Sequence, residues 1–201
     1  MRHIFKSGQL NGPTLLLLHG TGGNEHDLLP LAEIIDPNAN ILSVRGNVLE
    51  NGMPRFFKRL KAGVFDIEDL EKQTNELAEF IDQASKKYQF ARDKVVTVGY
   101  SNGANIAGSL LFHYENVLHG AILHHPMVPR RDIDIPNQNQ IPVFIGAGEN
   151  DPMCPPEESV ELERLLADRG ANVTIHWERN GHRLTQTEVE AARDWYQKHF
   201  K

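Results

Sequence analysis

The fold is decided by the stretch Val95-Val96-Thr97-Val98-Gly99-Tyr100-Ser101-Asn102-Gly103. Its first four residues are β-branched, which predicts a buried strand, and the apolar residues that follow at 104–111 predict a helix. The two glycines lie two residues on either side of Ser101, where a tight turn leaves no room for a β-carbon. The stretch therefore predicts a strand, a sharp turn and a helix, with Ser101 at the turn.

A serine at such a turn is suited to act as a nucleophile. It lies at the N-terminus of a helix, whose dipole favours developing negative charge. The alternative is that Ser101 is only an N-cap after a glycine turn. The pattern G-x-S-x-G is too short to decide by itself, and its place between a strand and a helix favours the nucleophile.

The rest of the chain alternates short apolar runs with amphipathic segments. This pattern predicts an α/β fold: a mostly parallel sheet of six to seven strands with helices on both faces. The expected strands are 14–18, 41–44, 95–98, 120–123, 142–145 and 173–177, with a short edge strand near 3–5. The expected helices are 27–35 with Asp27 as cap, a long helix from Asp66 to Tyr88, 101–114, 155–170, and a last helix after the capping box 185–188.

Composition limits the class of protein. The chain has 201 residues and a formal net charge of −6, which argues against a sequence-independent nucleic-acid binder and against adsorption to anionic membranes. Its single cysteine, Cys154, excludes an internal disulfide and suits a reducing compartment. Residues 1–6 lack the apolar core of a signal peptide, and the longest apolar run, 15–18, cannot span a bilayer. We therefore expect one cytoplasmic domain, 1–201.

A serine nucleophile needs a base and a residue that orients the base. Of the ten histidines, His182 lies in a loop between the last strand and the last helix, and such loops point toward the turn at Ser101. The carboxylate is expected after the preceding strand, where Asp151 is favoured and Glu149 stays open. The order Ser101, Asp151, His182 is the chain order of α/β-hydrolases.

An oxyanion hole is expected from two backbone N–H groups. One belongs to Asn102, directly after the nucleophile, and the other to Thr21 in the glycine-rich loop 19–23 that follows the first buried strand. Such a loop could instead cradle a phosphate, but it has neither the lysine of a P-loop nor the spacing G-x-G-x-x-G.

These motifs resemble, in order and spacing, the small phospholipase/carboxylesterase family of α/β-hydrolases, which includes acyl-protein thioesterase-like enzymes. The resemblance rests on the segments 18–23, 99–103, 151–152 and 181–182 and covers essentially the whole chain. The segments 45–47 and 53–57 look like a bacterial carboxylesterase branch linked to quinone stress. The resemblance implies a serine esterase with no metal and no cofactor. Asn102 replaces the Gln often found after the nucleophile in thioesterase members, and the serine at the turn disfavours a dienelactone hydrolase, which uses cysteine.

Several other residues have two readings each. Met53, Phe56 and Phe57 could line an acyl pocket or pack in the core. The basic residues of the segment 55–61 read as a solvated face more often than as an anion site. His124 and His125 end a strand; because neighbours on a strand point to opposite faces, a hydrogen-bonding role or a pocket wall is favoured over a metal site. Cys154 could lie near the site or simply pack.

We therefore expect a serine hydrolase that cleaves carboxylic esters, with short acyl chains preferred because the connection 124–141 is too short and proline-rich to form a cap domain. A thioesterase or lysophospholipase, a peptidase, and a non-catalytic ligand-binding protein of the same fold are the alternatives. The expected partner is a small ester, with no nucleic acid and no stable membrane association; a homodimer is left open.

Overall fold

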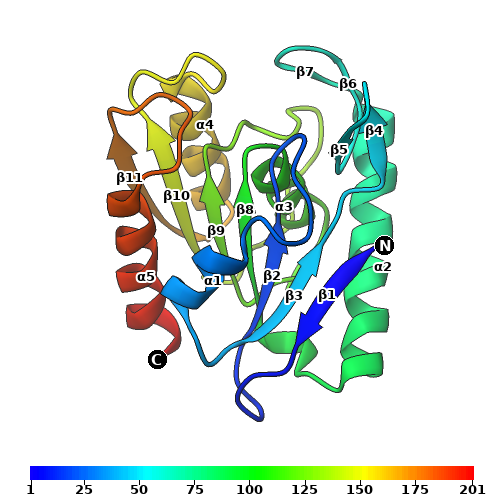
Figure 1. Ribbon diagram of the computed structural model, residues 1–201. Coiled ribbons are helices and arrows are strands. Elements are labelled where there is room, and N and C mark those ends of the chain that lie inside the picture. Colours follow the sequence, from blue (N-terminus) through cyan, green and yellow to red (C-terminus); the bar gives the residue numbers. More distant parts are fainter.

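The computed structural model describes residues 1–201 and is built on a seven-stranded sheet (Figure 1). The strand order is β1-β3-β2-β8-β9-β10-β11, and all neighbours are parallel except β1 and β3. The strands span His3–Lys6 (β1), Thr14–Leu18 (β2), Asn40–Val44 (β3), Val95–Tyr100 (β8), Gly120–His124 (β9), Pro142–Gly148 (β10) and Asn172–Glu178 (β11). The expected mostly parallel sheet is confirmed, and its carboxyl ends form one edge, at the top of Figure 1.

Helices cover both faces of the sheet. One face carries α1 (Leu29–Ile35) and α5 (Gln186–Phe200), and the other carries α2 (Ile67–Tyr88), α3 (Asn102–His113) and α4 (Pro156–Ala167); a short 3₁₀ turn, η1 (Arg92–Lys94), precedes β8. None of these helices combines the length and the apolar character needed to cross a membrane.

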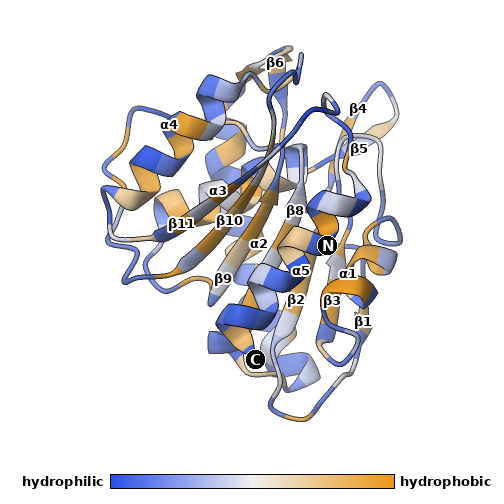
Figure 2. Ribbon diagram, turned by 90° about the vertical axis from the view of Figure 1, so that its left-hand side faces the viewer, coloured by the Kyte–Doolittle hydropathy of each residue, from blue (hydrophilic) through white to orange (hydrophobic).

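The two faces are separated by the period of the strands. In β2, Leu15 and Leu17 pack with α1 and α5, whereas Leu16 and Leu18 pack with α2, α3 and α4. All four are fully buried, because a strand with helices above and below it is apolar on both sides. Figure 2 shows the hydrophobic residues concentrated in the strands, while α4 and α5 alternate hydrophobic and hydrophilic residues.

Two small hairpins lie at the carboxyl edge of the sheet, in the segment between β3 and α2. The first pairs β4 (Val48–Glu50) with β5 (Met53–Arg55), and the second pairs β6 (Arg59–Lys61) with β7 (Val64–Phe65). The sequence analysis did not predict these four short strands. No cap domain is present, as expected, because the connection from β9 to β10 contains no helix.

The residues at the N-termini of α1 and α2 differ in whether a side chain caps the helix. The long helix expected from Asp66 is present as α2, and Asp66 caps it by accepting a hydrogen bond from the Asp69 N–H at 3.1 Å. The prediction that Asp27 caps α1 is wrong: the helix starts after Leu28 without a side-chain cap, and the Asp27 carboxylate accepts from Asn24 instead.

The predicted capping box of α5 is only half formed. The Thr185 hydroxyl accepts from the Glu188 N–H at 3.1 Å. The Glu188 carboxylate does not return to the helix start but is fully buried against the sheet, where two histidines contact it.

Candidate active site

Ser101 lies in the turn between β8 and α3 with strained backbone angles, φ 52° and ψ −113°, which place its side chain at the carboxyl edge of the sheet. The glycines around it are required by close approach. A β-carbon at Gly103 would lie 1.9 Å from the Leu18 carbonyl oxygen, and one at Gly99 would lie 2.7 Å from the backbone of Ala104. The predicted strand–turn–helix is therefore present.

Ser101, His182 and Asp151 are brought together from three loops. The Ser101 hydroxyl and His182 Nε2 are 2.9 Å apart, and His182 Nδ1 lies 2.7 Å from Asp151 Oδ2. The His182 side chain is 14% exposed and that of Asp151 is fully buried, so the histidine can contact a substrate while the carboxylate is shielded from solvent. This is the geometry of a serine nucleophile, its general base and the carboxylate that orients the base.

Asp151 is held as an ionised acceptor. Its Oδ1 accepts from the N–H groups of Met153 (2.8 Å) and Cys154 (3.0 Å). Burial raises the pKa of this carboxyl, but the hydrogen bonds from Cys154, His182 and Met153 outweigh burial and leave the pKa below its ordinary value. The alternative orienter, Glu149, is instead half exposed and pairs with Arg179 at 2.8 Å.

The two N–H groups expected to form an oxyanion hole border one cavity. Asn102 opens α3, whose first intrahelical bond runs from Asn105 N–H to the Ser101 carbonyl, so the Asn102 N–H has no acceptor within the helix. The N–H of Thr21 has no backbone acceptor either. Thr21, Ser101 and Asn102 line the same cavity, as such a hole requires.

Arg55, expected on a solvated face, is instead buried beside this loop, with a side chain 3% exposed. Its Nη1 donates to the Thr21 hydroxyl at 2.9 Å and to Glu50 at 3.0 Å, and its Nε donates to the Phe57 carbonyl at 3.1 Å. The first hairpin thus holds the glycine-rich loop through a buried guanidinium. A second tie runs from the Gly22 N–H to the Pro54 carbonyl at 2.9 Å.

The cavity beside Ser101 has a volume of about 360 Å³ and is open to solvent. Its walls come mainly from the two hairpins, the glycine-rich loop, the turn at Ser101 and the segment after Asp151. The lining residues are Thr21, Arg55, Arg59, Ala62, Gly63, Phe65, Ser101, Asn102, Asn105, Met127, Pro152, Met153, Cys154, Pro155 and Glu158. The expected pocket residues are not among them. Phe56 and Phe57 are fully buried in the core, and Met53 lies over Gly22, because the hairpin turns Arg55 rather than its aromatic neighbours toward the cavity.

Sequence reasoning missed two residues that fix the loops. The Tyr100 hydroxyl donates to the His182 carbonyl at 2.7 Å and so connects the loop that carries His182 to the turn at Ser101. His19 is buried, donates from Nδ1 to the Gly20 carbonyl at 2.6 Å and accepts from the Gly46 N–H at 3.1 Å. Burial lowers the pKa of His19, which suits this neutral, bridging role. The place of His19 directly before the glycines was the available signal.

His125 was expected to point away from His124, but it does not continue the strand. It follows β9 with φ 53°, and this turn brings its ring to Asp151. The polar atoms of His125, Asp151 and His182 lie within 4.8 Å of one another, a spacing that could suit a metal. They are already hydrogen-bonded: Asp151 Oδ2 accepts from both histidines, at 3.0 and 2.7 Å. Cys154 lines the cavity, and its thiol donates to the His125 carbonyl at 3.2 Å.

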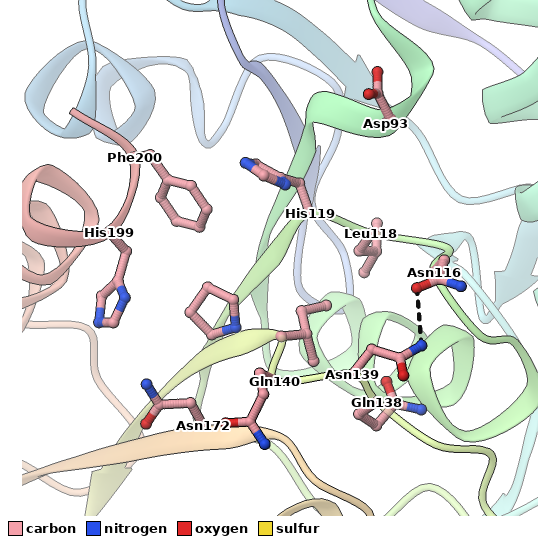
Figure 3. Close-up of a pocket in the computed structure, with 12 residues that line it drawn as sticks. Asp93, Asn116, Leu118, His119, Gln138, Asn139, Gln140, Asn172, His199 and Phe200 are labelled. Atoms are coloured by element: carbon pink, nitrogen blue, oxygen red, sulfur yellow. Dashed lines mark hydrogen bonds between the residues drawn. The ribbon is translucent and has the colours of Figure 1, made fainter.

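A larger cavity, of about 500 Å³, lies at the opposite edge of the sheet (Figure 3), where β10 and β11 begin. Figure 3 shows it framed by amide side chains, with Asn139 donating to Asn116 at 3.1 Å, and by His119 and Phe200. Its acidic residue, Asp93, and His119 are exposed. No activated nucleophile faces this cavity.

The chain is similar over nearly its whole length to proteins of one family. The family described as Phospholipase/Carboxylesterase matches residues 2–200. The chain is 62% identical over 196 residues to "Putative hydrolase MhqD" of Bacillus subtilis (strain 168), covering 98% of each protein. The crystal structure of the Bacillus cereus carboxylesterase has a TM-score of 0.98 at 63% identity, over 100% of this chain and 95% of that one. A carboxylesterase from Mesorhizobium loti has a TM-score of 0.87 at 30% identity, over 94% and 90%. The fold is that of the α/β-hydrolases.

Proposed function

Because the chain belongs to the phospholipase/carboxylesterase family of hydrolases, we propose that it cleaves short-chain carboxylic esters through an acyl-enzyme on Ser101. One observation carries the proposal: a continuous hydrogen-bonded series from Ser101 through His182 to a buried, ionised Asp151, at the mouth of an open cavity. A non-catalytic member of the fold would have no need of this alignment.

Acylation begins when the Ser101 oxygen attacks the ester carbonyl and His182 Nε2 takes the hydroxyl proton. Asp151 keeps the imidazole in the tautomer that has Nε2 free and stabilises the imidazolium. The carbonyl oxygen becomes an oxyanion facing the N–H groups of Thr21 and Asn102. When the tetrahedral intermediate collapses, the alcohol leaves with the proton from His182.

Deacylation repeats these steps with water in place of serine. His182 takes a proton from water, the resulting hydroxide attacks the acyl carbon, and the acid leaves as Ser101 recovers its proton. The balance is one ester and one water consumed, one acid and one alcohol formed. No step needs a metal or a cofactor.

The cavity supports the preference for short acyl groups. Seven of its fifteen lining residues are polar or charged, Arg59 and Glu158 among them, and no cap encloses it. An extended acyl chain would leave methylenes in water, and each unburied CH₂ forgoes about 0.8 kcal/mol of binding.

The test is labelling with a fluorophosphonate, which reacts with an activated serine. Wild-type protein should be labelled on Ser101, as located by peptide mass spectrometry, and Ser101→Ala should not be labelled. His182→Ala should react much more slowly although the serine is present. Equal labelling of wild type and Ser101→Ala would contradict the proposal. Once labelling at Ser101 is found, hydrolysis of a panel of esters, thioesters and amides defines the class of substrate.

A further inference from the structure

A second buried carboxylate lies behind the candidate triad. Glu188, on the first turn of α5, is fully buried and reaches the sheet beside Gly146. A β-carbon at Gly146 would lie 1.9 Å from Glu188 Oε1, so glycine at this position makes the room for the carboxylate. Its Oε1 lies 2.5 Å from His124 Nδ1, and its Oε2 lies 3.2 Å from His125 Nε2.

His125 lies between two carboxylates. Its Nδ1 is 3.0 Å from Asp151 Oδ2 and its Nε2 is 3.2 Å from Glu188 Oε2, and the residue is 1% exposed. A neutral imidazole has one donor and one acceptor nitrogen, so one of its lone pairs would face a carboxylate oxygen. With N–H groups on both nitrogens, each carboxylate receives a hydrogen bond.

The charges around His125 support the same protonation state. The groups that face it are Asp151 from the loop after β10, Glu188 from α5, His182 with ring centres 5.2 Å apart, Tyr100 with ring centres 6.1 Å apart, and the Cys154 thiol. Burial raises the pKa of both Tyr100 and Cys154, so neither adds charge. Burial lowers the pKa of His125, but its bonds to Glu188 and Asp151 outweigh burial and raise it.

We propose that His125 is a positioning residue of this site, held as an imidazolium by Glu188, and that it fixes Asp151 and cancels the charge of the second carboxylate. Asp151 and Glu188 contribute −2 and His125 contributes +1, so these three groups together carry a net charge of −1, as the single carboxylate of a triad does. The catalytic part of this inference rests on the proposed esterase function; the protonation state of His125 does not.

The protonation state is tested directly by NMR of the imidazole nitrogens. His125 is assigned by comparison with His125→Asn, because asparagine tolerates a positive φ and its amide nitrogen can replace Nδ1 as a donor to Asp151. Both nitrogens of His125 should be protonated in most molecules at pH 6.5, where an unperturbed imidazole is about half neutral. In Glu188→Gln, which keeps the size of the side chain, His125 should lose its proton at a lower pH. A neutral His125 at pH 6.5 in wild type would overturn the proposal, whether or not the protein cleaves esters.

The role in catalysis is tested by the pH profile of kcat/KM for p-nitrophenyl acetate. His125→Asn removes the cation next to Asp151, so His182 should hold its proton to higher pH and the acidic limb should move up by about one unit, with KM unchanged. On that limb, kcat/KM should fall about tenfold. The double variant His125→Asn, Glu188→Gln removes one charge of each sign and should recover at least half of the shift.

A merely structural role would not give this recovery. A profile of His125→Asn that coincides with wild type, or a double variant displaced as far as the single one, would overturn the positioning role. If His125→Asn does not fold, the His125 ring is assigned through its correlations to the backbone, and its NMR titration in Glu188→Gln still decides, because a deprotonation that occurs at the wild-type pH contradicts the proposed pair. Absence of ester hydrolysis in the wild type would contradict the proposed function and leave the NMR result standing.

Discussion

The amino edge of the sheet, where its parallel strands begin, and the carboxyl edge, where they end, differ in the ionisable groups that are buried there. The cavity at the amino edge is the larger, at about 500 Å³ against 360 Å³, yet none of the titratable residues that line it, Asp93, His119 and His199, is buried. At the carboxyl edge, Asp151, Glu188 and Arg55 are buried with their partners. Burying charge costs free energy unless it is paired, so a fold that keeps several such groups at one edge has placed its chemistry there. Volume alone would instead favour the amino edge.

The largest difference between the edges should come from their aspartates. Asp151→Asn should lower kcat for p-nitrophenyl acetate by about 10⁴, because the amide favours the wrong tautomer of His182. Asp93→Asn, at the amino edge, should stay within twofold. A near-normal rate for Asp151→Asn, measured by steady-state kinetics, would return the orienting role to another carboxylate and break the comparison.

The second largest effect should be that of the acyl-chain length of the ester, which depends on the carboxyl-edge cavity and not on the amino-edge cavity. The open carboxyl-edge cavity should make kcat/KM for p-nitrophenyl butyrate at least about tenfold higher than for the palmitate, with no activation by a lipid interface. His119→Trp, which obstructs the amino-edge cavity, should not change this ratio. A value that climbs steadily from C4 to C16 would point instead to a buried acyl tunnel.

The buried guanidinium at the carboxyl edge should have a smaller effect. Arg55→Met should lower kcat about tenfold, less than the loss of an oxyanion donor itself, because Arg55 acts on the Thr21 N–H only through the hydroxyl. Thr21→Val removes that hydroxyl, keeps the backbone donor and should give a similar loss. If both variants kept wild-type kcat, the hydrogen bond from the Arg55 guanidinium to Thr21 would have no part in holding the loop.

The smallest effect concerns stability in acid. Burial raises the pKa of Glu188, but the bonds from His124 and His125 prevail and lower it to about 2 from 4.5. A lowered pKa stabilises the fold above pH 4.5, and this contribution is lost as the pH falls toward 2. The difference in the free energy of unfolding between wild type and Glu188→Gln should therefore shrink from pH 5.5 to pH 3. Urea denaturation measures it; a constant difference would contradict the pairing of Glu188.

The strands and the long helix were predictable because their signals are local. The apolar run Thr14–Leu18 gave the observed strand, and the spacing of apolar residues after Asp66 gave the long helix. The position of Ser101 between a strand and a helix placed the sharp turn. The order of Ser101, Asp151 and His182 then selected the residues that the fold brings together, and their catalytic roles remain proposals.

The rest depends on contacts between distant segments. Arg55 sits in a segment that reads as solvated, because its partners Glu50 and Thr21 are recognised only once the hairpin is formed. The motif 185–188 predicts a complete capping box, but the Glu188 carboxylate is hydrogen-bonded to His124 and His125 instead of to the start of the helix. The hydrogen-bonding role favoured for His125 is present, but its orientation was predicted wrongly because a positive φ ends the alternation of the strand. Alternation and capping rules describe single elements and say nothing of such competition.

The central claim is that Ser101 at the carboxyl edge is the nucleophile of an esterase. The most direct measurement is kcat/KM for p-nitrophenyl acetate in wild type and Ser101→Ala, with circular dichroism to show that both are folded. The claim predicts clear hydrolysis by wild type and a loss of at least about 10⁴-fold in the variant. A folded Ser101→Ala that keeps more than about a hundredth of the wild-type value would contradict it.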